Sequence, residues 1–164
     1  MREPSDYSAE FADYLRSLGG EVALIGALAA LRYRSRPRET TDVDFLIREM
    51  GDIPGRLEAD GYEVKAMAEP RDSEPYLVLV RGKGVRVDIM AAQTEFQRSA
   101  LDRAIDGTIT AEDVIVFKLL AWRARDRADI ASILMAGHDL DEAYIEHWAS
   151  EWQVGDRWAQ AKLW

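Results

Sequence analysis

One short stretch constrains the fold more than any other, because acidic and apolar residues alternate along it: Asp42-Val43-Asp44-Phe45-Leu46-Ile47. Side chains along a β-strand point alternately to opposite faces. The stretch therefore predicts a strand with Val43, Phe45 and Ile47 on one face and both aspartates on the other. Neighbouring carboxylates repel each other and are costly to desolvate together. A divalent cation removes that conflict, because hard cations prefer carboxylate oxygens, so this strand is predicted to carry part of a metal site.

A second alternating run, Val85-Arg86-Val87-Asp88-Ile89, contributes a third carboxylate. It is predicted to be the second arm of a hairpin, whose connection over 81–84 has glycines where a positive φ is needed. If this arm lies beside the first acidic strand, Asp88 faces Asp42 and Asp44. We therefore expect the three aspartates to hold Mg²⁺, or Mn²⁺ in its place, for nucleotidyl transfer.

A strand, a glycine and a helix follow one another near the N-terminus. Val22–Ile25 is predicted to be a buried strand, Gly26 follows it, and 27–33 is rich in helix-forming residues. Glycine lets the backbone approach a ligand closely, and the first N–H groups of a helix have no internal partners, so such a junction attracts phosphate. The alternative interpretation is a tight turn without a ligand.

Four arginines lie between this junction and the acidic strand, in a basic island around Pro37: Arg32, Arg34, Arg36 and Arg38. A solvated loop is the simplest interpretation. The position of the island between a candidate phosphate site and a candidate metal site favours another, in which one or two arginines pair with a triphosphate or a substrate phosphate. We name Arg38 as a candidate nucleotide contact, together with Thr41, which directly precedes Asp42.

The remaining patterns predict a sheet core followed by helices. Helices are expected over 8–18, with Ser8 as N-cap, and over 52–60, within 91–105, from the cap Thr110 to 122, over 126–135 and over 140–152; further strands are expected over 62–66 and 76–80. Lys118 is the single charge in the apolar stretch from Val114 to Trp122. We expect an α/β (α+β) fold with a sheet core over 1–109 and a helical C-terminal cap over 110–164, packed together as one compact unit.

Composition excludes several classes of site. The 164 residues include no cysteine, so disulfides, thiolate zinc sites and a cysteine nucleophile are excluded. No signal run and no apolar stretch of membrane-spanning length is present, which predicts a protein of the cytoplasm without a membrane partner. The net charge of −9 repels nucleic acid, so a polynucleotide substrate would need a local basic patch.

Taken together, these motifs resemble the DNA polymerase β-like nucleotidyltransferase superfamily, and most of all its AbiEii-type and related small bacterial members. The resemblance lies in Gly26-Ala27 at a helix start, Asp42-Val43-Asp44 on a strand, Asp88 on a later strand, and the downstream stretch Glu112–Ile130, which contains Lys118, Arg123, Asp126 and Asp129 in the order typical of that group. It covers roughly residues 20–135. It implies a nucleotidyltransferase-type mixed sheet flanked by helices.

The resemblance also implies an activity, the transfer of a nucleoside monophosphate from a nucleoside triphosphate to a hydroxyl on an RNA end or a protein, as in toxin–antitoxin systems. Asp42 and Asp44 would bind two Mg²⁺ ions. Asp88 would complete one metal site and activate the attacking hydroxyl. Little covalent work would remain for the protein beyond positioning and charge stabilisation.

Three further roles follow from the resemblance. Gly26 would present its helix N-terminus to the β- and γ-phosphates, Lys118 would reach the phosphates or the acceptor, and Asp126 or Asp129 would orient Lys118 or Arg123. The alternatives are a snorkelling lysine at the helix edge and surface aspartates paired with nearby arginines. Ala27 departs from the family pattern, because many relatives carry a serine there whose hydroxyl touches phosphate. The backbone N–H groups survive this change.

Three functions therefore stay open. The first is transfer to RNA or protein. The second is transfer to a small, aminoglycoside-like acceptor, which the acidic balance of the chain favours. Because of Ala27 and the short chain, a non-catalytic nucleotide-binding or antitoxin-like module of the same fold is the third. The expected partners are a nucleoside triphosphate, the acceptor and a cognate antitoxin or toxin. The aromatic C-terminus is explained either by helix packing or by a homodimer surface built from Trp148, Trp152, Trp158 and Trp164.

Overall fold

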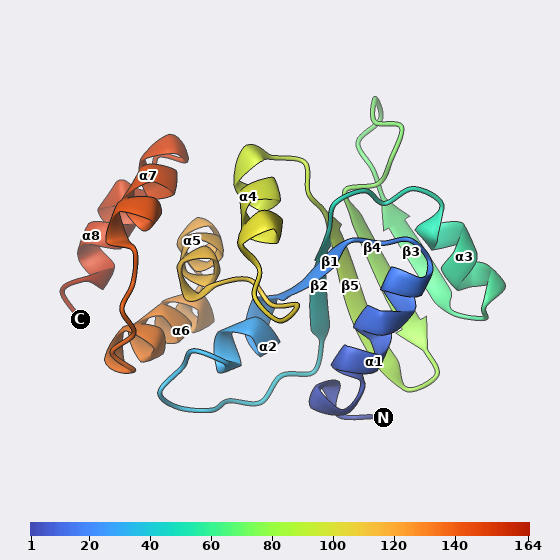
Figure 1. The fold of residues 1–164 in the computed structure, drawn as a ribbon, viewed down its shortest axis with the longest axis horizontal. Coiled ribbons are helices and arrows are strands. Elements are labelled where there is room, and N and C mark those ends of the chain that lie inside the picture. The colour runs from blue at the N-terminus through green and yellow to red at the C-terminus, as the bar shows by residue number, and fades with distance from the viewer.

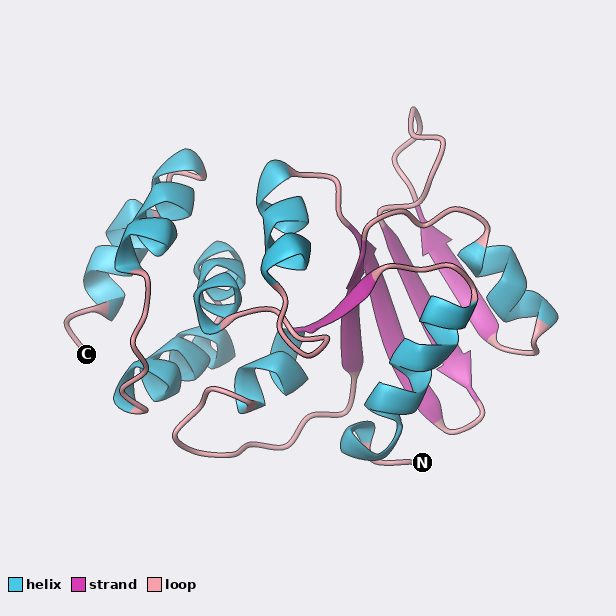
Figure 2. Ribbon diagram, in the orientation of Figure 1, coloured by secondary structure: helices cyan, strands magenta, loops and turns pink.

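The computed structural model describes residues 1–164 and contains one five-stranded mixed sheet and eight helices (Figures 1 and 2). The strands lie in the order β1-β2-β5-β4-β3, with bounds β1 Val22–Ile25, β2 Val43–Ile47, β3 Glu63–Met67, β4 Leu77–Gly82 and β5 Val85–Ala91. Only the central β2–β5 pair is parallel; the other neighbours are antiparallel. This confirms the mixed α/β fold that the sequence predicts.

Helices cover both faces of the sheet and form a separate cluster beside it (Figure 1). Their bounds are α1 Pro4–Ser17, α2 Gly26–Leu31, α3 Ile53–Ala59, α4 Glu95–Arg103, α5 Ala111–Ala121, α6 Ala124–Met135, α7 Glu142–Glu151 and α8 Gly155–Ala161. None of them has both the length and the apolar character needed to cross a bilayer.

Two apolar cores lie on opposite faces of the sheet. Val43, Phe45 and Ile47 of β2 pack in the first core with residues of α1 and α3. Leu46 belongs to the second core, which combines β1, α2 and α4 with the helices from α5 to α8. The alternation that predicts β2 is therefore confirmed: the apolar positions are fully buried, while Asp44 is only partly buried.

Two details of the predicted elements are wrong. The first helix begins at Pro4 with Glu3 as its N-cap, so Ser8 lies within the helix and caps nothing. Proline suits the first helical turn, because its missing N–H would have no partner there. The last helix, α8, is not among the predicted elements. Its seven residues include only two buried side chains, Trp158 and Ala161. This is too short an apolar pattern to predict a helix from the sequence.

The tryptophans of the C-terminal region do not share one environment. Trp158 is buried, whereas Trp152 and Trp164 are 42% and 52% exposed. The Trp164 ring stacks on Trp122, with the ring centroids 5.9 Å apart. Helix packing thus explains Trp158, and a homodimer surface stays a prediction for the exposed tryptophans.

Candidate functional site

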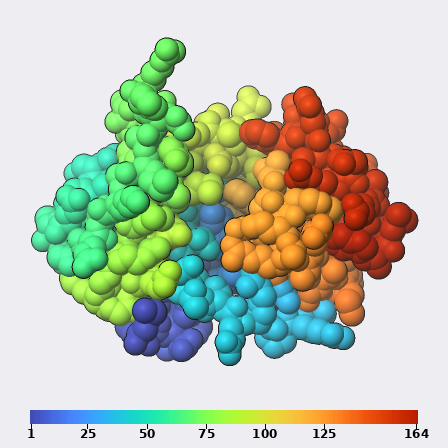
Figure 3. Space-filling view, turned by 180° about the vertical axis from the view of Figure 1, so that it is seen from behind, coloured from blue at the N-terminus to red at the C-terminus, as the bar shows by residue number.

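A cavity with a volume of about 540 Å³ lies between the sheet and the helical cluster. Figure 3 shows the hollow between the yellow-green strand region and the orange helices. It is lined by the β1–α2 junction, the chain over 38–44, β5, α5 and the start of α6. Ten of the eleven residues predicted for the site line it: Gly26, Ala27, Arg38, Thr41, Asp42, Asp44, Asp88, Lys118, Arg123 and Asp126. Asp129 lies behind this lining.

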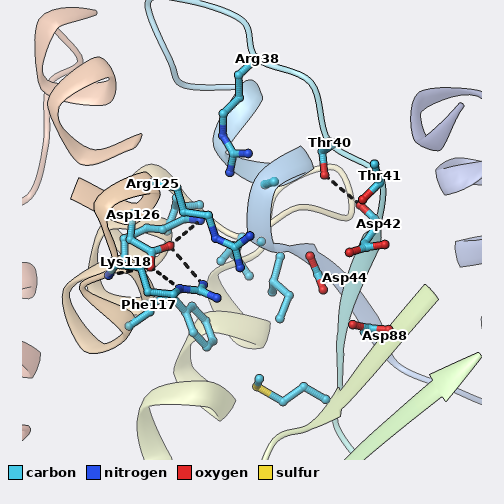
Figure 4. A pocket seen from close by; sticks show the side chains of 18 of the residues that line it. Arg38, Thr40, Thr41, Asp42, Asp44, Asp88, Phe117, Lys118, Arg125 and Asp126 are labelled. Atoms are coloured by element: carbon cyan, nitrogen blue, oxygen red, sulfur yellow. Dashed lines mark hydrogen bonds and ion pairs between the residues drawn. The ribbon is translucent and has the colours of Figure 1, made fainter. Parts of the chain in front are cut away.

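One side of the cavity is a wall of three carboxylates, which we call the acid wall: Asp42, Asp44 and Asp88. Asp44 and Asp88 are direct partners in the parallel β2–β5 register, and Asp42 immediately precedes β2. Figure 4 shows the three carboxylates together on the β2–β5 side. The conditional prediction that Asp88 would lie beside the other two if its strand neighbours theirs thus agrees with the observed strand order.

Asp44 is the carboxylate of the acid wall whose charged form is disfavoured by its surroundings. Burial raises the pKa of its carboxyl to about 6, and the charges of Asp88 and Asp42 add to the increase. Lys118 and Arg125 act in the opposite direction. A cation at the wall would relieve this repulsion, and carboxylate oxygens are the donors that Mg²⁺ and Mn²⁺ prefer. The donor chemistry of the acid wall therefore fits a divalent metal.

Two of the three carboxylates form ion pairs with arginines. Arg86 Nε lies 2.9 Å from Asp42 Oδ1, and Arg81 Nη1 lies 2.9 Å from Asp88 Oδ1. In this arrangement no group of three or more acidic or histidine side chains lies close enough together to hold a metal ion. Arg86 Nε and Asp42 Oδ1 are also buried without a well-aligned hydrogen bond. Metal binding would thus require the side chains of the acid wall to rearrange.

Gly26 leaves room for the Asp44 carboxylate. Its φ is +69°, and a Cβ placed on it would lie only 2.2 Å from Asp44 Oδ2. Glycine is therefore required at the strand–helix junction for two reasons, the left-handed backbone and the close approach of a carboxylate. The prediction of a special glycine agrees with this geometry, although the group that approaches it belongs to the protein itself.

Replacing Gly26 by alanine should displace Asp44 and lower both stability and any metal-dependent activity. We expect a loss of about 2–4 kcal/mol in the free energy of unfolding, combining backbone strain with the steric clash. The matched control is Gly137→Ala, because Gly137 has a similar φ of +76° but nothing within 4 Å of the added Cβ. Denaturant unfolding of both variants tests this, and equal losses would contradict the claimed contact.

The opposite side of the cavity is cationic, and we call it the basic wall: Arg38, Lys118, Arg123 and Arg125. Lys118 Nζ lies 2.9 Å from Asp129 Oδ2 and 3.2 Å from Asp126 Oδ1. Arg123 donates from Nε to Asp126 Oδ2 at 2.7 Å. Both aspartates are fully buried, so their interpretation as surface acids is wrong. Lys118 is likewise buried, which excludes a snorkelling lysine.

Asp129 also fastens the basic island to α6. Arg38 donates to both Asp129 oxygens, at 3.0 and 3.1 Å, and Arg34 contacts the same carboxylate. The Ser35 backbone N–H donates to the carbonyl of Ser132 at 3.0 Å. The chain that leads into Asp42 is therefore docked on the helical cluster, and its first half is not a freely solvated loop.

Arg125 is the functional candidate that sequence reasoning missed. Its side chain lines the cavity, is exposed and forms no hydrogen bond or ion pair. Figure 4 shows its guanidinium extending into the cavity toward Asp44. The sequence contains one signal for Arg125, which is its place beside Arg123 and Asp126 in the downstream motif. The sequence does not reveal that these neighbours are paired while Arg125 is free.

Similar folds occur among solved structures. The antibiotic-resistance factor ANT(2'')-Ia, determined in solution, is 15% identical with a TM-score of 0.62, over 98% of this chain and 97% of that one. An antigenic nucleotidyltransferase-like protein from Paracoccidioides brasiliensis is 17% identical with a TM-score of 0.50, over 92% and 88%. No protein-family model and no curated protein matches the sequence. At these identities the likeness establishes a nucleotidyltransferase fold, and the AbiEii subtype stays a prediction.

Proposed function

We propose that this protein is a metal-dependent nucleotidyltransferase, which moves a nucleoside monophosphate from a nucleoside triphosphate to a hydroxyl acceptor. One observation carries the proposal: the acid wall and the basic wall face each other across a single cavity (Figure 4). A triphosphate with its divalent cation has the matching separation of charge, because the metal is positive and the phosphate chain is negative. The nucleotidyltransferase fold supports the same activity.

In this proposal the three carboxylates share the metal and the proton. Asp42 and Asp44 would hold Mg²⁺, which when bound supplies charge stabilisation at the phosphoryl oxygens. Asp88 would complete the ligand set and accept the proton of the attacking hydroxyl. The hydroxyl oxygen would bond to the α-phosphorus as the bond from that phosphorus to the bridging oxygen breaks, so that pyrophosphate leaves.

The basic wall would bind the phosphate chain. Arg125 is its one cation without an internal partner, so it would contact the phosphates directly. Lys118, Arg38 and Arg123 are held by buried carboxylates and would contribute positive potential from fixed positions. The backbone at Gly26 and Ala27 and the hydroxyl of Thr41 complete the lining that we propose for the triphosphate.

The acceptor that the charges favour is a small cationic molecule. The cavity lining includes the exposed carboxylate of Glu39, and the whole chain carries a net charge of −9. Both attract amines and repel RNA. Transfer to RNA or protein in a toxin–antitoxin pair is the second candidate, which the motifs of the downstream helices favour.

A transfer assay tests the proposal. The protein is incubated with α-³²P-labelled ATP, GTP, CTP or UTP and Mg²⁺, with total RNA, cell-extract protein or aminoglycosides as acceptors. We expect label on one acceptor class and none in EDTA. Absence of transfer with all three classes, together with no calorimetric binding of any triphosphate, would contradict the proposal. Binding without transfer would favour the non-catalytic module.

Arg125→Met should raise the KM for the nucleoside triphosphate about 10- to 100-fold, since it removes a charge-assisted contact. Thermal stability should stay unchanged, because Arg125 has no internal partner. The matched control is Arg127→Met on the same helix, an exposed arginine that does not line the cavity. Equal KM values for both variants would exclude Arg125 from the phosphate site.

A further inference from the structure

The cavity has a third side, which neither charged wall uses. We call it the apolar floor, and it consists of Ile25, Met90, Ile109, Val114 and Phe117. Ile25, Ile109 and Val114 are buried, whereas Met90 and Phe117 are only partly buried. The accessible surface of the floor therefore comes chiefly from one flexible thioether and one aromatic ring.

The floor lies within reach of the acid wall. Met90 follows Asp88 by two residues on the same face of β5, which places the two about 7 Å apart along the strand. Phe117 directly precedes Lys118 on α5. A group joined to a phosphate at the acid wall by a linker the length of one pentose could therefore contact the apolar floor.

The Phe117 ring is supported from behind. Its centroid lies 4.9 Å from that of Phe96 at an interplanar angle of 57°, and Phe96 in turn packs on Trp148 with centroids 5.5 Å apart. Figure 4 shows the Phe117 ring beside the cavity, below Lys118. An aromatic side chain that is held by other rings offers a fixed surface for stacking.

We propose that the apolar floor binds the nucleobase of the donor nucleotide, with the base stacked against Phe117 and in contact with Met90. This inference rests on the proposed function. The phosphate chain cannot occupy an apolar surface without losing its hydration, so once the metal and phosphates take the charged walls, the base is the part that remains for the floor. No floor residue carries a hydrogen-bonding group other than the weak thioether acceptor of Met90.

A floor of this kind recognises bases by stacking and not by their edges. We therefore expect ATP, GTP, CTP and UTP to bind with affinities within about tenfold of one another, the purines more tightly, because every base has a face that can stack. A selective site would require polar side chains placed against the edge of the base.

Calorimetric binding in Mg²⁺ tests the inference, with each of the four triphosphates and with inorganic tripolyphosphate, which has no base. Phe117→Ala should weaken binding of each nucleoside triphosphate roughly 5- to 150-fold, whereas tripolyphosphate should bind as it does to the wild type. Phe117→Leu keeps most of the apolar volume and should give a smaller loss. The control for altered packing is Leu57→Val in the core on the opposite face of the sheet, which does not line the cavity and should leave both affinities within about threefold.

The outcomes separate the inference from the proposed function. If the wild type binds triphosphates and Phe117→Ala weakens nucleoside triphosphates and tripolyphosphate equally, or neither, the floor does not hold the base, and the proposed function stands. A preference of more than a hundredfold for one base would also overturn the inference. If the wild type binds neither triphosphate nor tripolyphosphate, the proposed function fails and the inference falls with it.

Discussion

Asp44→Asn should abolish nucleotidyl transfer while making the metal-free protein more stable. The loss of a metal ligand should lower kcat by about 10²- to 10⁴-fold. The stability gain follows from the pKa of Asp44, which lies at about 6 in the folded protein against an ordinary 3.8. At pH 7 the folded protein holds a partly buried charge beside two other carboxylates, whereas the unfolded chain exposes that charge to water. Removing that charge should stabilise the variant by up to about 3 kcal/mol.

The pH dependence of this effect has a defined sign. Between about pH 4 and 6 the folded protein keeps a proton on Asp44 that the unfolded chain loses. Wild-type stability should therefore fall as the pH rises through this window, relative to Asp44→Asn. Below pH 4 the carboxyl is protonated in both states and the difference should vanish.

Urea unfolding at pH 4 and pH 7, with and without Mg²⁺, measures these differences. The wild type should gain stability from Mg²⁺ at pH 7, and Asp44→Asn should gain little. The matched control is Asp139→Asn, an exposed aspartate outside the cavity, which should behave like the wild type. A variant that transfers nucleotide as fast as the wild type would remove Asp44 from the site.

Asp129→Ala should produce the largest loss of stability, about 3–5 kcal/mol. Asp129 is fully buried and pairs with Lys118, Arg34 and Arg38, of which the first two have side chains only 8% exposed. Removing the carboxylate would leave the buried Arg34 without its carboxylate partner and Lys118 with Asp126 alone. For a chain of this size the melting temperature should fall by roughly 6–20 °C.

The same change should affect the site through the docked chain. The residues from Arg34 to Arg38 would lose their anchor on α6, and this chain leads directly into Asp42. Asp13→Ala is the control, because Asp13 is 80% exposed and its pair with Arg16 should contribute less than about 0.5 kcal/mol. If Asp129→Ala unfolds within about 1 kcal/mol of the wild type, Asp129 does not hold this network together.

The sequence could predict the parts of the site that depend on local pattern. Alternation alone places Asp42 and Asp44 on one face of β2, and the turn glycines fix the hairpin that contains Asp88. Which strand lies next to β2 is a non-local choice. From the sequence, Asp44 and Asp88 are predicted to lie together only if their strands are neighbours. The parallel β2–β5 register meets this condition.

Other parts of the site could not be predicted, because they depend on contacts between distant residues. Asp129 meets Arg34 across 95 positions, and nothing in either local sequence marks the pair. The free state of Arg125 is evident only after its neighbours are seen to be paired. Phe117 has the spacing of an ordinary core residue, and its partial exposure arises because α5 packs on α2, α6 and α7 and faces the sheet across the cavity.

A crystal structure with Mn²⁺ and a nonhydrolysable nucleoside triphosphate tests the central claim most directly. The anomalous scattering of Mn²⁺ locates the ion independently of the electron density of the nucleotide. We expect an anomalous peak coordinated by Asp42, Asp44 and Asp88, with the phosphates directed toward Arg125. Clear nucleotide density elsewhere on the molecule, or a cavity that still has Arg81 and Arg86 on the aspartates at saturating Mn²⁺ and nucleotide, would contradict it.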